Sequence, residues 1–151
     1  ARMLLEIAGA TVAQITVMSI LIAIRWITIP TDIFYMLSAW LLMAMFAIGL
    51  GLVICSISFH FEPFGKVWST VSFIMMPLSG VFFFVHNLPQ QIQHYALMFP
   101  MVHGTEMFRA GYFGKDITTY ENPWYILLCN LILLLLGLVL ITKFSKGVEP
   151  Q

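Results

Sequence analysis

Three serines recur at helical spacing inside a long apolar stretch of this chain. Ser69, Ser72 and Ser79, together with Met76, fall on one side of a helix. Hydroxyls in such a row can form hydrogen bonds with a polar solute that moves along the helix, so the row could form one wall of a conduit. The sequence leaves a second interpretation open, in which each serine bonds a carbonyl of its own helix or packs against a neighbouring helix.

The chain carries no residue pattern typical of an enzyme. Gly65–Lys66 and Gly114–Lys115 lack both the upstream glycine and the following Ser or Thr of a phosphate-binding loop. His94 and His103 stand isolated, without the spacing of a metal site. No charged residue lies in the middle of any long apolar stretch, which disfavours a proton-driven pump. We therefore expect no catalytic residue, cofactor or metal in this chain, and either a passive channel or a transporter that another subunit powers.

The composition is that of a membrane protein. Of the 151 residues, 60% are hydrophobic and 9% are charged, whereas a soluble domain carries about 25% charged residues. Lipid must therefore cover most of the outer surface. The formal net charge of zero argues against a nucleic-acid partner. Cys55 and Cys129 lie within apolar runs and are expected to pack against neighbours. Since the first residue is Ala1 and not Met, we expect an N-terminally incomplete chain.

Four apolar stretches are long enough to cross a bilayer, which takes about 20 residues in a helix. They cover residues 7–29, 33–59, 67–85 and 124–141, and Pro77 would kink the third. The alternation of polar and apolar residues that marks a membrane β-barrel does not occur in them. We thus predict an all-α membrane protein with four transmembrane helices, which form a single domain over residues 1–151.

The connector before the last span is long and is not simply polar. Apolar side chains recur at helical spacing in residues 88–99, and a second short helix can run over residues 101–110 until Gly111 stops it. Both helices are too short to cross a bilayer. We therefore expect a helical hairpin over residues 88–111, and its apolar faces suit either a re-entrant or an interfacial position.

The distribution of basic residues gives an orientation. Lys143 and Lys146 directly follow the last span, which places the C-terminal end in the cytoplasm. Because four spans bring both ends to the same side, the N-terminal end and the turn at residues 60–66 are expected there too. The hairpin over residues 88–111 then lies on the outer face.

Small and polar residues within the spans point to helix contacts. Ala47, Gly51 and Cys55 form a stripe along which another helix can approach closely. Gln14 is the one large polar group of the first span. A buried amide in lipid needs a partner, and either an interhelical hydrogen bond or a contact with a transport pathway can explain Gln14.

The residues around the hairpin resemble a known family. MPLSGVFFFVHNLP (Met76–Pro89) and LPQQIQHYALMFPMVHGTEMFRAGYFG (Leu88–Gly114) resemble the permease subunits of type-2 ABC exporters, in particular the inner-membrane permease of capsular polysaccharide export. ARMLLEIAGAT (Ala1–Thr11) is similar to the start of that family's third membrane helix. The resemblance covers essentially the whole chain and implies that its four spans are the last four of six.

The resemblance also implies partners and a substrate. Members of the family are homodimers in the bacterial inner membrane, in contact with membrane lipid, and two separate nucleotide-binding subunits hydrolyse ATP with Mg. The implied substrate is a lipid-linked capsular polysaccharide, passed on to periplasmic and outer-membrane export components. O-antigen or teichoic-acid chains stay open, because the same permease fold would serve them. A non-transporting assembly or scaffold protein, whose stripes serve only helix association, is the alternative from another class.

Three groups of candidate site residues follow. We expect the conduit to be lined by Ser69, Ser72, Phe73, Met76, Ser79, Tyr35 and Trp40. Forming the outer gate we expect Phe84, His86, Asn87, Arg109 and Tyr112. Contacting the ATPase we expect Arg2, Glu6, His60, Glu62 and Lys66. Arg109 could meet an acidic sugar on the outer face, or it could form an ion pair with Glu106 three residues before it.

Overall fold

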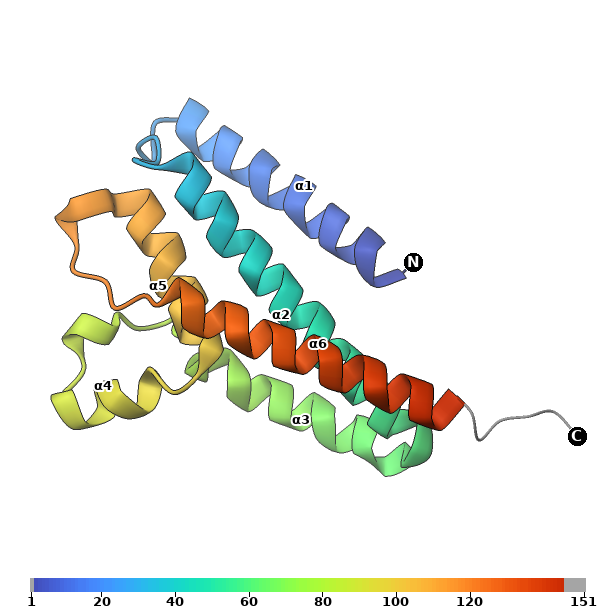
Figure 1. Cartoon of the computed structure of the whole chain (residues 1–151). Helices are drawn as coiled ribbons and strands as arrows, with labels where there is room; N and C mark the ends of the chain where they lie inside the picture. The colour runs from blue at the N-terminus through green and yellow to red at the C-terminus, as the bar shows by residue number, and fades with distance from the viewer. Residues whose placement is uncertain (1, 146–151) are drawn as a thin grey trace, which may run out of the picture.

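The structure is built of helices joined by short turns and loops (Figure 1). The computed structural model describes residues 2–145, and the side chains of residues 2, 3, 62, 144 and 145 lie outside that description. In chain order the helices are α1 (Arg2–Ala23), α2 (Ile33–His60), α3 (Glu62–Leu78), η1 (Val85–Asn87), α4 (Gln90–Ala96), α5 (Pro100–Phe113), η2 (Gly114–Asp116) and α6 (Pro123–Ser145), where η marks a 3-10 helix. The all-α prediction is thus confirmed for the described residues.

Three of the described helices are long and apolar enough to cross a membrane. Their candidate spans are Leu4–Ala23, Ile33–His60 and Pro123–Lys143, with 20, 28 and 21 residues. Side-chain caps fix where two of them begin, because Asp32 accepts a hydrogen bond from the Tyr35 amide at 3.0 Å and Asn122 accepts one from the Tyr125 amide at 3.2 Å. These two starts lie within one residue of the predicted ones.

The predicted third span is not one continuous helix over residues 67–85. α3 covers Glu62–Leu78 and has 17 residues. Pro77 has no backbone N–H to continue the ladder, and Gly80 takes a φ of 82°, so the chain turns away directly after the helix. α3 is therefore not among the three helices of membrane length, and the fourth span stays a prediction.

α1 also ends earlier than the predicted residue 29. The Trp26 amide donates to the Leu21 carbonyl and the Arg25 amide to the Ile22 carbonyl, both at 3.0 Å, which is the hydrogen-bond pattern of a Schellman cap. Arg25 takes the left-handed position of that cap, with a φ of 60°. The following residues 27–29 are β-branched and precede a proline, so they favour an extended backbone.

The core of the bundle lies where α2 meets α5 and α6. Two glycines allow α2 and α6 to approach closely, since a Cβ on Gly137 would lie 2.8 Å from Leu52 Cβ and one on Gly49 would lie 3.0 Å from Leu133 Cβ. The predicted stripe is on a different face, because Ala47 and Cys55 are exposed. Gly49, not Gly51, therefore marks the contact with α6.

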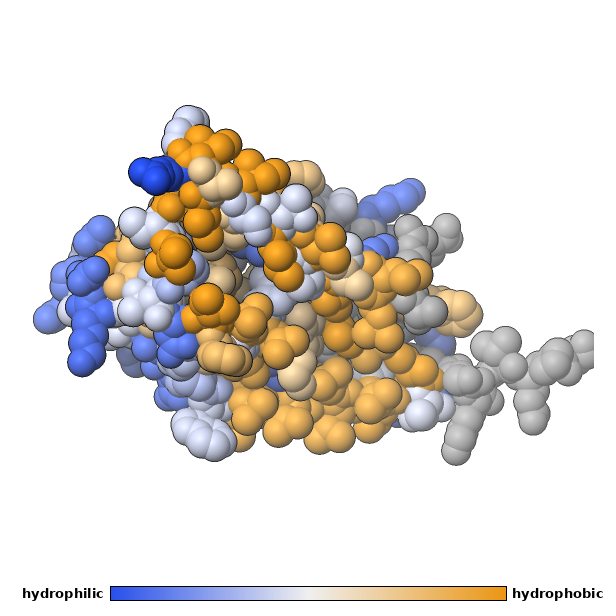
Figure 2. Space-filling model, turned by 90° about the horizontal axis from the view of Figure 1, so that it is seen from above, coloured by the Kyte–Doolittle hydropathy of each residue, from blue (hydrophilic) through white to orange (hydrophobic). Residues whose placement is uncertain are grey.

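α1, α2, α3 and α6 alternate in direction, so the N-terminal end of α1 and the C-terminal end of α6 lie at one end of the bundle (Figure 1). The opposite end, called here the α4–α5 end, carries residues 24–32 and 79–122. Figure 2 shows one face of the molecule, on which hydrophobic side chains cover the long helices and hydrophilic ones gather at the α4–α5 end. This distribution suits a bundle that crosses lipid and meets water beyond its ends.

Candidate functional site

The face of α3 that carries Ser69 and Ser72 is exposed. Phe73 and Met76 lie beside these serines on the same face, and 78% of Phe73 is accessible. The hydroxyls of Ser69 and Ser72 donate to the carbonyls of Lys66 and Trp68, each at 2.9 Å. Each of these two serines therefore bonds a carbonyl of its own helix, as the second interpretation predicted, and its oxygen keeps lone pairs that can accept a hydrogen bond.

Ser79 does not belong to this exposed face. Only 6% of it is accessible, because it caps α3 and lies under α5. Its hydroxyl donates to the Met76 carbonyl at 2.6 Å, and its own carbonyl accepts from the Thr105 hydroxyl at 3.1 Å. The prediction that Ser79 continues the stripe assumed a helix through residue 85, and the end of α3 at Leu78 removes that assumption.

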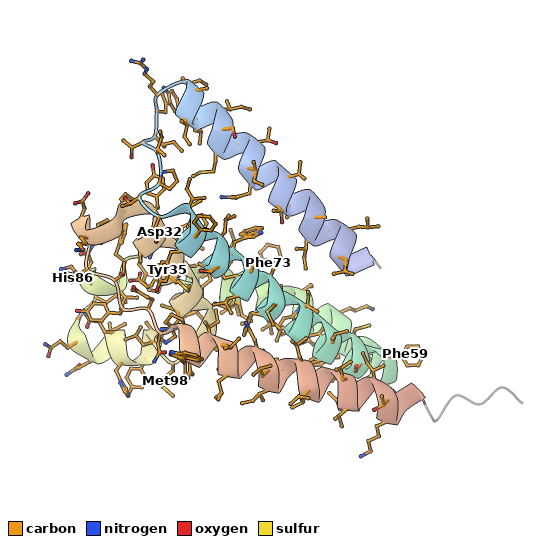
Figure 3. All side chains as sticks on the ribbon, turned by 45° about the horizontal axis from the view of Figure 1, so that its top comes forward. Asp32, Tyr35, Phe59, Phe73, His86 and Met98 are labelled. Atoms are coloured by element: carbon orange, nitrogen blue, oxygen red, sulfur yellow. The ribbon has the colours of Figure 1, made fainter. Side chains whose placement is uncertain are left out.

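Tyr35 and Trp40 lie on α2, away from the serine face. The indole N–H of Trp40 donates to the Thr11 hydroxyl on α1 at 3.0 Å. Trp40 lines two cavities between α1 and the rest of the bundle, with volumes of about 880 Å³ and 350 Å³, and no residue of α3 lines either. Tyr35 lies at the α4–α5 end beside Glu121, in the region that Figure 3 labels with Asp32. The predicted conduit residues therefore do not form one surface. Four lie on the exposed face of α3, Ser79 is buried under α5, and Tyr35 and Trp40 lie at different positions on α2.

Gln14 faces the cavities between α1 and α2. It lines both of them and is exposed. Among the described residues, no interhelical hydrogen bond to the Gln14 amide occurs, and the side chain faces these two cavities. Trp40 and Thr11 instead form the polar link between α1 and α2.

Two predicted gate residues, Phe84 and Arg109, are in direct contact. The guanidinium carbon of Arg109 lies 4.4 Å from the centre of the Phe84 ring. Its Nη2 donates to the carbonyls of Gly80 and Val81, at 2.6 Å and 3.1 Å, and its Nη1 donates to Phe83 O and to Glu106 Oε1, both at 2.8 Å. Arg109 therefore holds the loop that follows α3 against α5.

The remaining gate residues divide between two sites. His86 and Asn87 are exposed on η1, near this loop. Tyr112 points the other way along α5, where its hydroxyl donates to the Thr28 carbonyl at 3.1 Å. Its carbonyl accepts from the Thr31 amide at 3.2 Å, so Tyr112 joins α5 to the turn between α1 and α2.

The sequence pattern predicted that Gly111 stops the second helix of the hairpin, and this prediction is wrong. α5 continues to Phe113 and ends at Gly114, which has a φ of 62°. A Cβ on Gly111 would lie 2.6 Å from the Met36 backbone nitrogen. Gly111 is therefore needed for the close approach of α5 to α2, and Gly114 supplies the positive φ at which the helix ends.

The predicted ATPase contacts that the structure describes, Glu6, His60 and Lys66, lie at the end of the bundle where α1 starts and α6 ends. His60 is the last residue of α2 and Lys66 lies near the start of α3, so the predicted turn at residues 60–66 is reduced to Phe61 between the two helices. Figure 3 places the adjacent Phe59 at this end. Glu6 is exposed near the start of α1. The side chains of Arg2 and Glu62 lie outside the described residues.

Sequence reasoning missed two polar side chains that link helices, the buried Asn130 and the partly buried Thr105. Asn130, fully buried in α6, donates its Nδ2 to the Leu42 carbonyl of α2 at 2.8 Å. A single amide within an apolar run was the signal that could have found it. Thr105, which bonds the end of α3, has no such signal, since its partner is fixed by tertiary packing alone.

An all-helical chain with three membrane-length helices, an exposed hydroxyl stripe and a packed helical end has the form of a membrane permease. Among the described residues, no group of three His, Cys, Asp or Glu side chains could hold a metal ion. The model of the ABC-2 type transporter family matches residues 1–113, and the chain belongs to this family.

The chain is similar to named bacterial proteins along its whole length. It is 80% identical over 151 residues to the capsule polysaccharide export inner-membrane protein CtrC of Neisseria meningitidis serogroup A, covering all of this chain and 57% of the relative. It is 62% identical over 150 residues to the capsule polysaccharide export inner-membrane protein BexB of Haemophilus influenzae, covering 99% and 57%. The polysialic acid transport protein KpsM of Escherichia coli is 27% identical over 144 residues, covering 93% and 54%. The chain thus spans little more than half the length of these relatives.

Proposed function

We propose that this chain is part of the permease subunit of an ABC exporter that moves a lipid-linked capsular polysaccharide across the bacterial inner membrane. The observation that carries the proposal is the 80% identity, over the whole chain, to a protein named for capsule polysaccharide export. The relatives described above are named for capsule or polysialic acid, which favours these substrates over O-antigen or teichoic-acid chains.

α3 would supply the fourth crossing of the membrane. It runs antiparallel to α2 (Figure 1), and its 17 residues give a helix of about 25 Å at about 1.5 Å per residue. This length falls a few ångströms short of the hydrocarbon core of about 30 Å. The loop after Leu78 would then lie at the edge of the membrane, where Arg109 bonds its carbonyls.

The helical hairpin would enter the membrane from the α4–α5 end through α5 alone. α5 packs against α2 and α6, and Val102, Gly104 and Met107 are buried there. Helical backbone at that depth is tolerated because protein surrounds it. This arrangement supports a re-entrant α5 and leaves α4 at the periphery.

The conduit would form where the exposed face of α3 meets that of a second copy. Ser69 and Ser72 offer acceptors, and Phe73 offers a ring that can stack on a sugar. Ser79, Tyr35 and Trp40 are not part of this proposed surface, since the first is buried and the other two lie on α2. Phe84, His86 and Asn87 would form the outer rim.

ATP hydrolysis would take place in separate nucleotide-binding subunits that hold ATP and Mg. They would contact the end that carries Glu6, His60 and Lys66, and both chain ends would then be cytoplasmic. The basic Lys143 in the last turn of α6 supports this orientation.

Capsule export in living cells tests the proposal. The full-length protein that contains this chain is expressed in cells that lack their own capsule-export permease, with either an intact or a hydrolysis-deficient partner ATPase. We expect surface polysaccharide to return only with the intact ATPase. Membrane insertion without surface polysaccharide, and without an ATPase that co-purifies, would instead support the scaffold alternative.

A matched pair of substitutions tests the conduit within the same assay. Ser72→Trp places a large ring on the serine face of α3, and Ile74→Trp places the same ring on another exposed face of the helix. We expect Ser72→Trp to lower surface polysaccharide severalfold at equal protein level, and Ile74→Trp to leave it unchanged. Equal losses would contradict the assignment of the conduit to this face.

A further inference from the structure

α4 is an amphipathic helix whose apolar side is uncovered. Ile92 and Tyr95, with Phe99 just beyond the helix, lie on one side and are 51%, 67% and 39% accessible. Gln90 and His94, four residues apart, lie on the other side and are exposed. Exposing large apolar side chains to water costs free energy in proportion to the exposed area. We therefore expect lipid or protein to cover the apolar side of α4.

The segment around α4 carries no charge. No Asp, Glu, Lys or Arg occurs between Lys66 and Glu106. A short helix that stood in bulk water with its apolar side exposed would ordinarily carry charged side chains for solubility. At the boundary between lipid and water, buried apolar area contributes to the binding free energy, so α4 can lie there through its apolar side without charged side chains.

A hydrogen bond fixes the depth of α4 relative to a membrane span. The Tyr125 hydroxyl, in the first turn of α6, donates to the Met98 carbonyl just after α4 at 2.9 Å. The neighbouring Trp124 is 79% exposed. Trp and Tyr concentrate where membrane lipid meets water. The start of α6, and with it the C-terminal flank of α4, therefore lies at that level, next to the apolar surface of α6.

A second copy of the chain is less suited than lipid to contact the apolar side of α4. A stable protein interface buries about 800 Å² on each partner. The seven residues of α4 make a helix of about 10 Å at about 1.5 Å per residue, and one side of it cannot supply that area. Lipid imposes no such minimum area, and it already faces the exposed apolar side chains of α6, among them Leu131 and Leu135.

We propose that α4 lies in the membrane interface at the α4–α5 end, with Ile92, Tyr95 and Phe99 against lipid and Gln90 and His94 toward water. The inference rests on the proposed insertion of α6 as a membrane span.

The interfacial position of α4 determines the height of η1. The Gln93 amide donates to the carbonyls of Leu88 and His86, at 2.9 Å and 3.4 Å. Figure 3 shows His86 and Met98 at this same end of the bundle. The lipid surface therefore positions His86 and Asn87 through α4, so that the proposed rim of the conduit opens at the water boundary.

Spin-label accessibility in bilayer vesicles tests this position. The full-length protein, with its native cysteines replaced by alanine, carries one nitroxide at a time, at Ile92→Cys, Phe99→Cys, Gln90→Cys or His94→Cys. Relaxation by oxygen, which concentrates in lipid, is compared with relaxation by a water-soluble nickel chelate. We expect the oxygen-to-nickel ratio to be severalfold higher at positions 92 and 99 than at positions 90 and 94.

Two results would overturn the inference. Nickel access at all four positions would place α4 in water, and exclusion of both reagents at positions 92 and 99 would show that protein, such as a second copy, covers them. A label at Leu135→Cys, on the exposed surface of α6, separates this inference from the proposed function. If the Leu135 label is accessible to oxygen while the labels on α4 are not, only the position of α4 is wrong.

Discussion

The guanidinium of Arg109 lies against the carboxylate of Glu106, with Nη1 2.8 Å from Oε1, and no part of Glu106 is exposed. The second oxygen of Glu106 accepts from the Tyr120 amide at 3.3 Å. The pair therefore joins the loop after α3, α5 and the segment before α6. The sequence offered two roles for Arg109, and the ion pair is the one that the geometry supports.

Removal of one member of this pair is expected to destabilise the protein strongly. Glu106→Ala leaves the Arg109 charge without its carboxylate, and loss of one partner of a buried pair costs about 3–5 kcal/mol. Arg109→Lys should also destabilise, because a single ammonium cannot reach the carbonyls of Gly80, Val81 and Phe83 together. Thermal unfolding in detergent measures both changes.

An exposed carboxylate gives the control for this measurement. Asp116→Asn, on η2, removes a negative charge without a buried partner and should leave the unfolding temperature unchanged. If Glu106→Ala shifts the unfolding temperature no more than Asp116→Asn does, the pair is not a structural link.

Gly137→Ala is expected to disturb the contact between α2 and α6. The added Cβ would lie 2.8 Å from Leu52 Cβ, so the helices must move apart, at a cost of about 1–3 kcal/mol. Gly9→Ala is the matched control, since nothing lies within 4 Å of its added Cβ and alanine is the better helix former. Unfolding of both variants in detergent should show a loss for Gly137→Ala alone, and equal stability of the two would contradict the close contact.

Asn130→Leu should have a much smaller effect than loss of the ion pair. Its hydrogen bond to the Leu42 carbonyl is lost, but side-chain hydrogen bonds between membrane helices contribute only about 0.6 kcal/mol on average. The carbonyl of Leu42 lies within α2 and can keep its helical partner. A loss comparable with that of Glu106→Ala in the same unfolding assay would show that Asn130 has a further role.

Thiol labelling in membranes distinguishes three positions on and after α3. In the full-length protein without native cysteines, Ser72→Cys should react with a water-soluble thiol reagent faster than Ile74→Cys. Both side chains are exposed in the isolated chain, so only a difference between water and lipid can separate them. Ser79→Cys should be the slowest, because that position is buried under α5. Equal rates at positions 72 and 74 would count against a water-filled conduit on this face.

Local sequence signals placed the starts of two helices to within one residue. The apolar stretches predicted at residues 33–59 and 124–141 correspond to α2 (Ile33–His60) and α6 (Pro123–Ser145), and α6 ends four residues later than predicted. An Asx cap begins each helix, and apolar residues continue without interruption afterwards. Such signals lie within the helix itself, so no neighbour is needed to interpret them. Composition likewise predicted the membrane class from the excess of apolar over charged residues.

Only the tertiary structure determines which side of each helix packs against the rest of the protein. Periodicity placed Ser79 with Ser72 on one face, yet α3 ends first and α5 covers Ser79. Gly111 looked like a helix stop because glycine often ends helices, but its missing Cβ instead makes room for Met36. A sequence pattern indicates which side of a helix is apolar. Within a membrane, however, either lipid or protein can cover an apolar side. Only the positions of the neighbouring helices show which of the two lies against a given side chain.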